Sequence, residues 1–149
     1  MADAGGPYVQ VAGFCDTFIE DKGGVLSLIR MIDTIITSAA GTEPPTKMPP
    51  LSRTLNLIIM LKSGSALGRH ELTIKPKAPS EQELPSLPFS IHFEGEEKGV
   101  NVIARLNLVL EEEGVYWFAV MVDNALVTKV PLRVRYSRMV TATHSPNPS

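Results

Sequence analysis

The feature that most limits how this chain can fold is a row of apolar side chains at every second position near its end. The row comprises Tyr116, Phe118, Val120 and Val122. The pair Asp123-Asn124 follows, and then a second stretch of strand-forming residues that ends at Tyr136. Because Asp and Asn tolerate positive φ better than most residues, the pair fits the type I′ turn of a β-hairpin. The segment therefore predicts two antiparallel strands and an all-β domain.

Six further segments have the composition of strands and are bounded by glycine or proline turns. They are Tyr8–Ile19, Val25–Ile36, Leu51–Leu61, His70–Ile74, Leu87–Phe93 and Val100–Leu110. The second also fits a helical stripe, but its β-branched residues and the preceding glycine turn favour a strand. The proline-rich connector Thr42–Pro50 is expected to cross between sheets. Together the eight strands predict an antiparallel β-sandwich, with a closed or partly open β-barrel as the alternative.

The closing hairpin also carries a family resemblance. Its pattern is Glu112-x-Gly114-x-Tyr116-x-Phe118-x-Val120-x-Val122-Asp123-Asn124, ending in Pro131-Leu132-x-Val134-x-Tyr136, with Gly23-Gly24-x-Leu26-x-Leu28-Ile29 earlier in the chain. It resembles a bacterial family of small β-sandwich proteins of unassigned function, over roughly Val9–Tyr136. The resemblance implies an immunoglobulin-like sandwich and supplies no catalytic or ligand residues. The acidic residue, glycine and tyrosine also fit a tyrosine corner, in which the hydroxyl of Tyr116 contacts backbone a few residues upstream.

Size and charge narrow the functional classes. A chain of 149 residues is about one domain, and 44% hydrophobic residues can build its core. We expect a flexible N-terminus at 1–7, one sandwich at 8–136 and a disordered tail at 137–149. A net charge of −2 disfavours a nucleic-acid partner. No run of about 18 apolar residues predicts a membrane span, no signal peptide is evident, and the lone Cys15 fits a reducing, cytoplasmic location.

No motif predicts an enzyme. The three histidines, His70, His92 and His144, lack metal-ligand spacing, and His70 is expected to be partly buried and hydrogen-bonded. The glutamate clusters 94–97 and 111–113 could suggest calcium, but lack the aspartate-rich spacing of a calcium loop and are expected to be solvated. No nucleophile or phosphate-loop motif occurs. We therefore expect no catalytic residue, metal or cofactor.

One row of residues suggests a contact surface. Val115, Trp117, Ala119 and Met121 alternate with the core positions of the closing strand, where a solvated sheet would carry polar residues. Ile58 and Met60 are out of phase with their own core residues. If their strands share a sheet, these six side chains form one apolar patch, although the proline-rich loops or the tail could cover Trp117.

The sequence thus predicts a structural or protein-interaction module without enzymatic activity. Its partner would be another protein or a second copy, in a homodimer formed through the patch around Trp117. The alternative is a module that binds a carbohydrate or another small ligand, since such sites place aromatic rings beside polar groups.

Overall fold

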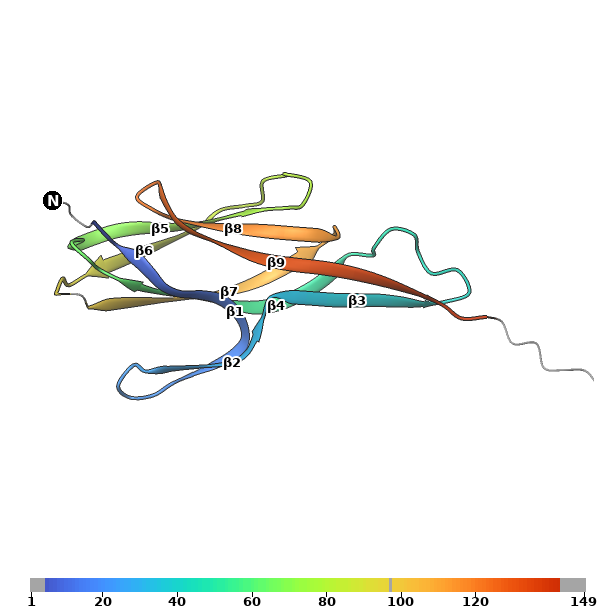
Figure 1. Cartoon of the computed structure of the whole chain (residues 1–149), viewed down its shortest axis with the longest axis horizontal. Helices are drawn as coiled ribbons and strands as arrows, with labels where there is room; N and C mark the ends of the chain where they lie inside the picture. Colours follow the sequence, from blue (N-terminus) through green and yellow to red (C-terminus); the bar gives the residue numbers. More distant parts are fainter. Residues whose placement is uncertain (1–4, 97, 143–149) are drawn as a thin grey trace, which may run out of the picture.

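Two facing sheets bury alternate side chains of their strands between them. The computed structural model describes residues 5–96 and 98–142, and within them it contains nine strands and no helix. The strands are β1 (Tyr8–Glu20), β2 (Leu26–Ile32), β3 (Thr34–Gly41), β4 (Leu51–Lys62), β5 (Gly68–Lys77), β6 (Leu87–Phe93), β7 (Gly99–Leu110), β8 (Gly114–Val122) and β9 (Ala125–Val140). One sheet has the order β2-β1-β4-β7 and the other β3-β9-β8-β5-β6, which makes the predicted sandwich (Figure 1).

The segment expected to be one strand from Val25 to Ile36 is two strands in different sheets. Strand β2 pairs with β1, whereas β3 pairs with β9. The carbonyl of Asp33, between them, accepts a hydrogen bond from the amide of Arg133 at 2.9 Å, which ties the start of β3 to β9. Ile32 and Ile35 both contact the core because the chain changes sheet between them. This change of phase explains the spacing of three that resembled a helix.

The core lies between the inward rows of the two sheets. From β8 the predicted row is buried: Tyr116, Phe118, Val120 and Val122. Strand β4 contributes Leu55, Leu57, Ile59 and Leu61 from the facing sheet. The rings of Phe14 and Phe118 meet edge to face, with centroids 4.9 Å apart. Apolar burial across this contact therefore specifies which face of each strand points inward.

The closing hairpin has the turn and the corner that its residues predict. Asp123 and Asn124 have φ values of 47° and 67°, as the type I′ turn requires. The amides of Glu111 and Glu112 donate to the hydroxyl oxygen of Tyr116 at 3.1 and 3.2 Å. This is the expected tyrosine corner, and it closes the turn between β7 and β8.

The last strand is longer than expected, and one pair is parallel. Strand β9 continues past Tyr136, where we expected the domain to end, as far as Val140, and β3 runs parallel to it. The connector 42–50 crosses between sheets as predicted and packs against this ribbon. The hydroxyl of Tyr136 donates to the carbonyl of Pro45 at 2.6 Å, and the guanidinium of Arg138 to that of Pro44 at 3.0 Å. The rest of the expected tail, 143–149 with His144, and residues 1–4 lie outside the described residues.

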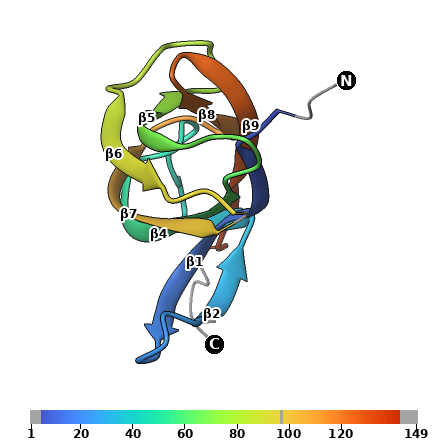
Figure 2. The same ribbon diagram turned by 90° about the vertical axis from the view of Figure 1, so that its left-hand side faces the viewer.

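The hairpin of β1 and β2 projects away from the sandwich (Figure 2). Its turn is held by Asp21, whose carboxylate accepts hydrogen bonds from the amides of Gly23 and Val25 at 2.8 and 3.0 Å. Where the hairpin meets the sheet, Asp16 forms ion pairs with Arg30 and Arg53. These polar contacts stabilise the two ends of an element that the core does not enclose.

Replacing Tyr116 with Phe should destabilise the fold by about 1–2 kcal/mol, because two partly buried amides lose their acceptor. Urea denaturation measures the change. Tyr136→Phe is the matched control, since it also removes one hydroxyl but from an exposed hydrogen bond. Equal losses in the two variants would contradict a special role for the tyrosine corner.

Candidate functional site

Trp117, in the middle of β8, is an exposed aromatic side chain on the outer face of the five-stranded sheet. Its neighbours in the strand, Tyr116 and Phe118, are buried, while the indole is 45% exposed. Val115, Ala119 and Met121 lie on the same outer face and are half-buried. The four outward residues expected from the alternation therefore share one surface of the five-stranded sheet.

A groove runs over this surface and has a volume of about 670 Å³. Val115, Trp117 and Ala119 contribute to it from β8, and the loop between β5 and β6 contributes Pro79 and Leu84 among others. The proline-rich loop thus lies beside the indole and leaves it half-exposed. A groove of this volume is within the range of about 300–1,000 Å³ found for ligand sites.

Charged side chains of both signs line the groove: Lys75, Lys77 and Lys129, and from the loop after β5 Glu81 and Glu83. Lys77 lies opposite Trp117 on β5, and Lys75 and Lys129 lie opposite Ala119 on β5 and β9. Lys77 forms an exposed ion pair with Glu81 at 3.6 Å, whereas the other two lysines form none within the described residues. The three lysines and two glutamates leave the groove with a small excess of positive charge, although the whole chain has a net charge of −2, and this excess favours anionic groups.

Ile58 and Met60 do not join this surface. They lie on β4, which belongs to the four-stranded sheet together with β7. Ile58 is fully buried and Met60 half-buried. The expectation that the strands of these residues share a sheet with Trp117 is therefore wrong. Phase within a strand shows which side chains face outward, but sheet membership depends on pairing between distant segments.

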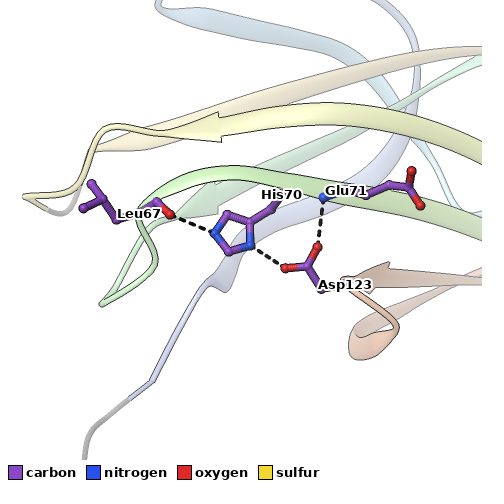
Figure 3. A network of polar contacts seen from close by, with 4 residues as sticks. All are labelled: Leu67, His70, Glu71 and Asp123. Atoms are coloured by element: carbon purple, nitrogen blue, oxygen red, sulfur yellow. Dashed lines mark hydrogen bonds and ion pairs between the residues drawn. The ribbon is translucent and has the colours of Figure 1, made fainter.

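A second polar cluster joins the closing turn to β5 (Figure 3). The Nδ1 atom of His70 contacts the carboxylate of Asp123, and its Nε2 atom lies 3.1 Å from the carbonyl oxygen of Leu67. The same carboxylate accepts a hydrogen bond from the amide of Glu71 at 3.0 Å, and Phe93 meets the imidazole edge to face. The expectation that His70 is partly buried and hydrogen-bonded is confirmed.

Both ring nitrogens of His70 face acceptor oxygens, and both can donate only when the imidazole is protonated, so this arrangement favours the charged form. The hydrogen bond to Asp123 is the main reason that the pKa of His70 is raised above its ordinary value, and the Leu67 carbonyl adds to the shift. The Glu71 amide, followed by His70, lowers the pKa of Asp123. We assign a structural role to the pair of His70 and Asp123, because it connects the closing turn to the neighbouring strand β5.

Two of the glutamates after β7, which we expected to be solvated, form hydrogen bonds that connect distant segments. The carboxylate of Glu112 accepts hydrogen bonds from the amide and the hydroxyl of Ser80, both at 3.0 Å. Glu113 accepts from the amide of Tyr136, also at 3.0 Å. Sequence spacing gave no signal for these contacts, since each joins segments far apart in the chain.

The remaining candidate groups give no catalytic arrangement. Cys15 is buried, and burial followed by the nearby Asp16 raises the pKa of its thiol, which disfavours the nucleophilic thiolate. Within the described residues, no three His, Cys, Asp or Glu side chains are grouped as a metal site requires. No helix in that part of the chain is long and apolar enough to cross a membrane.

Fold and groove together define a β-sandwich domain with a surface groove that carries an exposed tryptophan and a small excess of lysines. The chain belongs to a protein family of unknown function, DUF6941, whose model matches residues 10–135. The match includes the whole of β2 to β8 and most of β1 and β9. No curated protein matches the sequence.

The contribution of His70 to stability should depend on pH. Because its folded-state pKa is raised, the stabilisation is complete below its ordinary value of about 6.5 and is lost as the pH rises through the folded-state pKa. For Asp123, with a lowered pKa, the stabilisation is lost as the pH falls below its ordinary value. We expect His70→Gln to lower the urea midpoint at about pH 6 and to change it much less at about pH 9.

Asp123→Asn is the matched variant, because Asn tolerates positive φ and preserves the turn while removing the charge. It should reduce the same pH dependence. A difference between wild type and His70→Gln that is constant across the pH range would contradict the charged pair.

Proposed function

We propose that this protein is a non-enzymatic interaction module that binds another protein through the groove at Trp117. The observation that carries the proposal is a half-exposed indole in a groove of about 670 Å³. Tryptophan is enriched among the residues that dominate binding energy at protein interfaces. A flat, rigid side chain at this place offers a large contact area with little loss of rotamer entropy.

Charge favours a partner with an acidic surface over a second copy of this chain. Lys75 and Lys129 lie beside the indole without an ion pair in the described part of the chain. In a symmetric dimer through this face, the excess of lysines over glutamates would be present on both sides of the contact, which disfavours self-association. A partner that presents carboxylates would instead gain both apolar contact with Trp117 and ion pairs at the rim.

A small-ligand or carbohydrate site is the second candidate. The volume of the groove and the position of the indole beside polar groups support it. An indole face can stack on a sugar ring, and the lysines would favour an acidic sugar. This candidate requires a response of Trp117 fluorescence to a glycan, which the protein-binding proposal does not require.

We also propose that the sandwich is immunoglobulin-like. The orders β1-β4-β7 and β9-β8-β5 support this, because they correspond to the A-B-E and G-F-C strands of that fold. A bacterial origin is part of the same proposal and rests on the resemblance of the closing hairpin. The cytoplasmic location rests on the single cysteine, Cys15, which has no partner in the chain for a disulfide.

Trp117→Ala should weaken binding to the partner by about tenfold or more, without changing the thermal midpoint, because the indole lies outside the core. The partner is isolated with the wild-type chain as bait and its affinity is measured by calorimetry. Leu126→Ala is the matched control, since it removes an exposed apolar side chain elsewhere on the same hairpin.

Lys75→Glu should also weaken binding and reduce its dependence on salt. Unchanged affinity in both Trp117→Ala and Lys75→Glu would refute the groove as the binding site. Sedimentation of the wild-type chain tests the homodimer, and a glycan panel monitored by Trp117 fluorescence tests the second candidate.

A further inference from the structure

Strand β9 extends beyond the strand that covers one of its edges. Strand β8 starts at Gly114, which pairs with Val134. On the other edge β9 remains paired with β3 as far as Val140, the partner of Gly41. Within the described residues, the segment Arg135–Val140 therefore has a strand on one side only. Figure 1 shows this ribbon of β3 and β9 running past the end of β8.

The hydrogen-bond pattern identifies the backbone groups at the open edge. The amides of Arg133 and Thr141 donate to carbonyls of Asp33 and Gly41, so the odd-numbered positions direct their backbone groups toward β3. Successive residues of a strand alternate in this direction. Tyr136, Arg138 and Val140 therefore direct theirs to the other edge.

One of these three positions is already occupied. The amide of Tyr136 donates to the carboxylate of Glu113, just before β8 begins, so this amide is not available to an added strand. Arg138 and Val140 have no neighbouring strand on that side within the described residues. Their amides and carbonyls can accept an added strand.

The composition of the ribbon limits what can pair with this edge. Parallel strand pairs are normally covered on both faces, and natural sheets protect open edges with charged side chains, proline, bulges or very short strands; of these devices this stretch of β9 carries charged side chains, Arg135 and Arg138. Here the pairing with β3 is regular from Thr34 to Gly41. Met139 and Val140 are 56% and 67% exposed. An added strand would cover apolar surface as well as backbone groups.

We propose that the open edge of β9 at Arg138 and Val140 binds an extended acidic segment of another protein, which adds as a strand beside β9. Strand β9 contains three arginines and one lysine and no acidic residue. Arg135 forms no ion pair within the described part of the chain, and Arg138 contacts the carbonyl of Pro44. Carboxylates on the incoming strand would therefore meet complementary charge.

The same charges argue against a second copy at this edge. Self-pairing would bring Arg135 and Arg138 of each copy into one short stretch, and like charges on paired strands are destabilising. The site is also distinct from the Trp117 groove, because recognition here uses backbone groups and the edge of the sheet. Strand addition gives affinity through main-chain hydrogen bonds and specificity through the alternate side chains.

The test is amide hydrogen exchange measured by NMR on the full chain. The probe is a capped peptide of about eight residues that alternates Glu and Val, and its control alternates Lys and Val. The acidic peptide should slow exchange at Arg138 and Val140 by about tenfold or more, while Ser137 and Met139, which face β3, change little. The basic peptide should have no such effect.

Val140→Pro removes the amide that faces the open edge and leaves the donors toward β3 intact. It should lower the affinity for the acidic peptide by about tenfold, whereas Val140→Ala and Trp117→Ala should bind the peptide nearly as the wild type does. Circular dichroism melts verify that each variant is folded.

Three results would overturn the proposal. The first is protection of Arg138 and Val140 in dilute protein without peptide, which would mean that the chain covers its own edge. The second is protection that rises with protein concentration alone, which would mean a second copy. The third is equal protection, or none, with the two peptides.

Discussion

Everything in this structure depends on the contact between the inward rows of the two sheets, centred on the edge-to-face packing of Phe14 and Phe118. Side chains of a strand alternate between faces with a period of two. Once Phe118 is buried, Trp117 must point outward. The exposure of the indole is therefore a consequence of core packing. The residues around the indole determine whether it can bind a partner.

Those surroundings come from strands that are distant in sequence. Lys75 and Lys77 reach the indole from β5, and Lys129 reaches it from β9. The loop after β5 adds the wall of the groove, and Ser80 of that loop is hydrogen-bonded to Glu112 in the turn before β8. A surface that the sequence shows only as apolar is thus a groove around one aromatic ring, lined by three lysines and two glutamates.

The change of sheet at Asp33 has a comparable effect on the edge of the same five-stranded sheet. It separates β3 from β2, which pairs with β1, and places β3 parallel to β9. Because β3 supports β9 to Val140, while β8 covers it only to Val134, one edge is left open. The fold thereby offers two separate surfaces on one sheet, a side-chain groove and a backbone edge.

Local patterns predicted the elements well. Alternation of apolar residues predicted the buried row of β8, and the Asp123-Asn124 pair predicted its turn. The spacing of Tyr116 predicted the tyrosine corner. Patterns failed where the outcome depended on pairing between distant segments. They joined β2 and β3 into one strand and placed Ile58 beside Trp117 in one sheet.

By itself, the sequence determined the all-β class, the inward and outward faces of most strands and the closing turn, because these depend on side-chain period and on local φ preferences. Only the tertiary structure decided which strands share a sheet, how His70 meets Asp123 and where an edge stays open. Those features depend on which distant segments pair, and the free energy of that choice is shared over the whole core rather than encoded in any one stretch of residues.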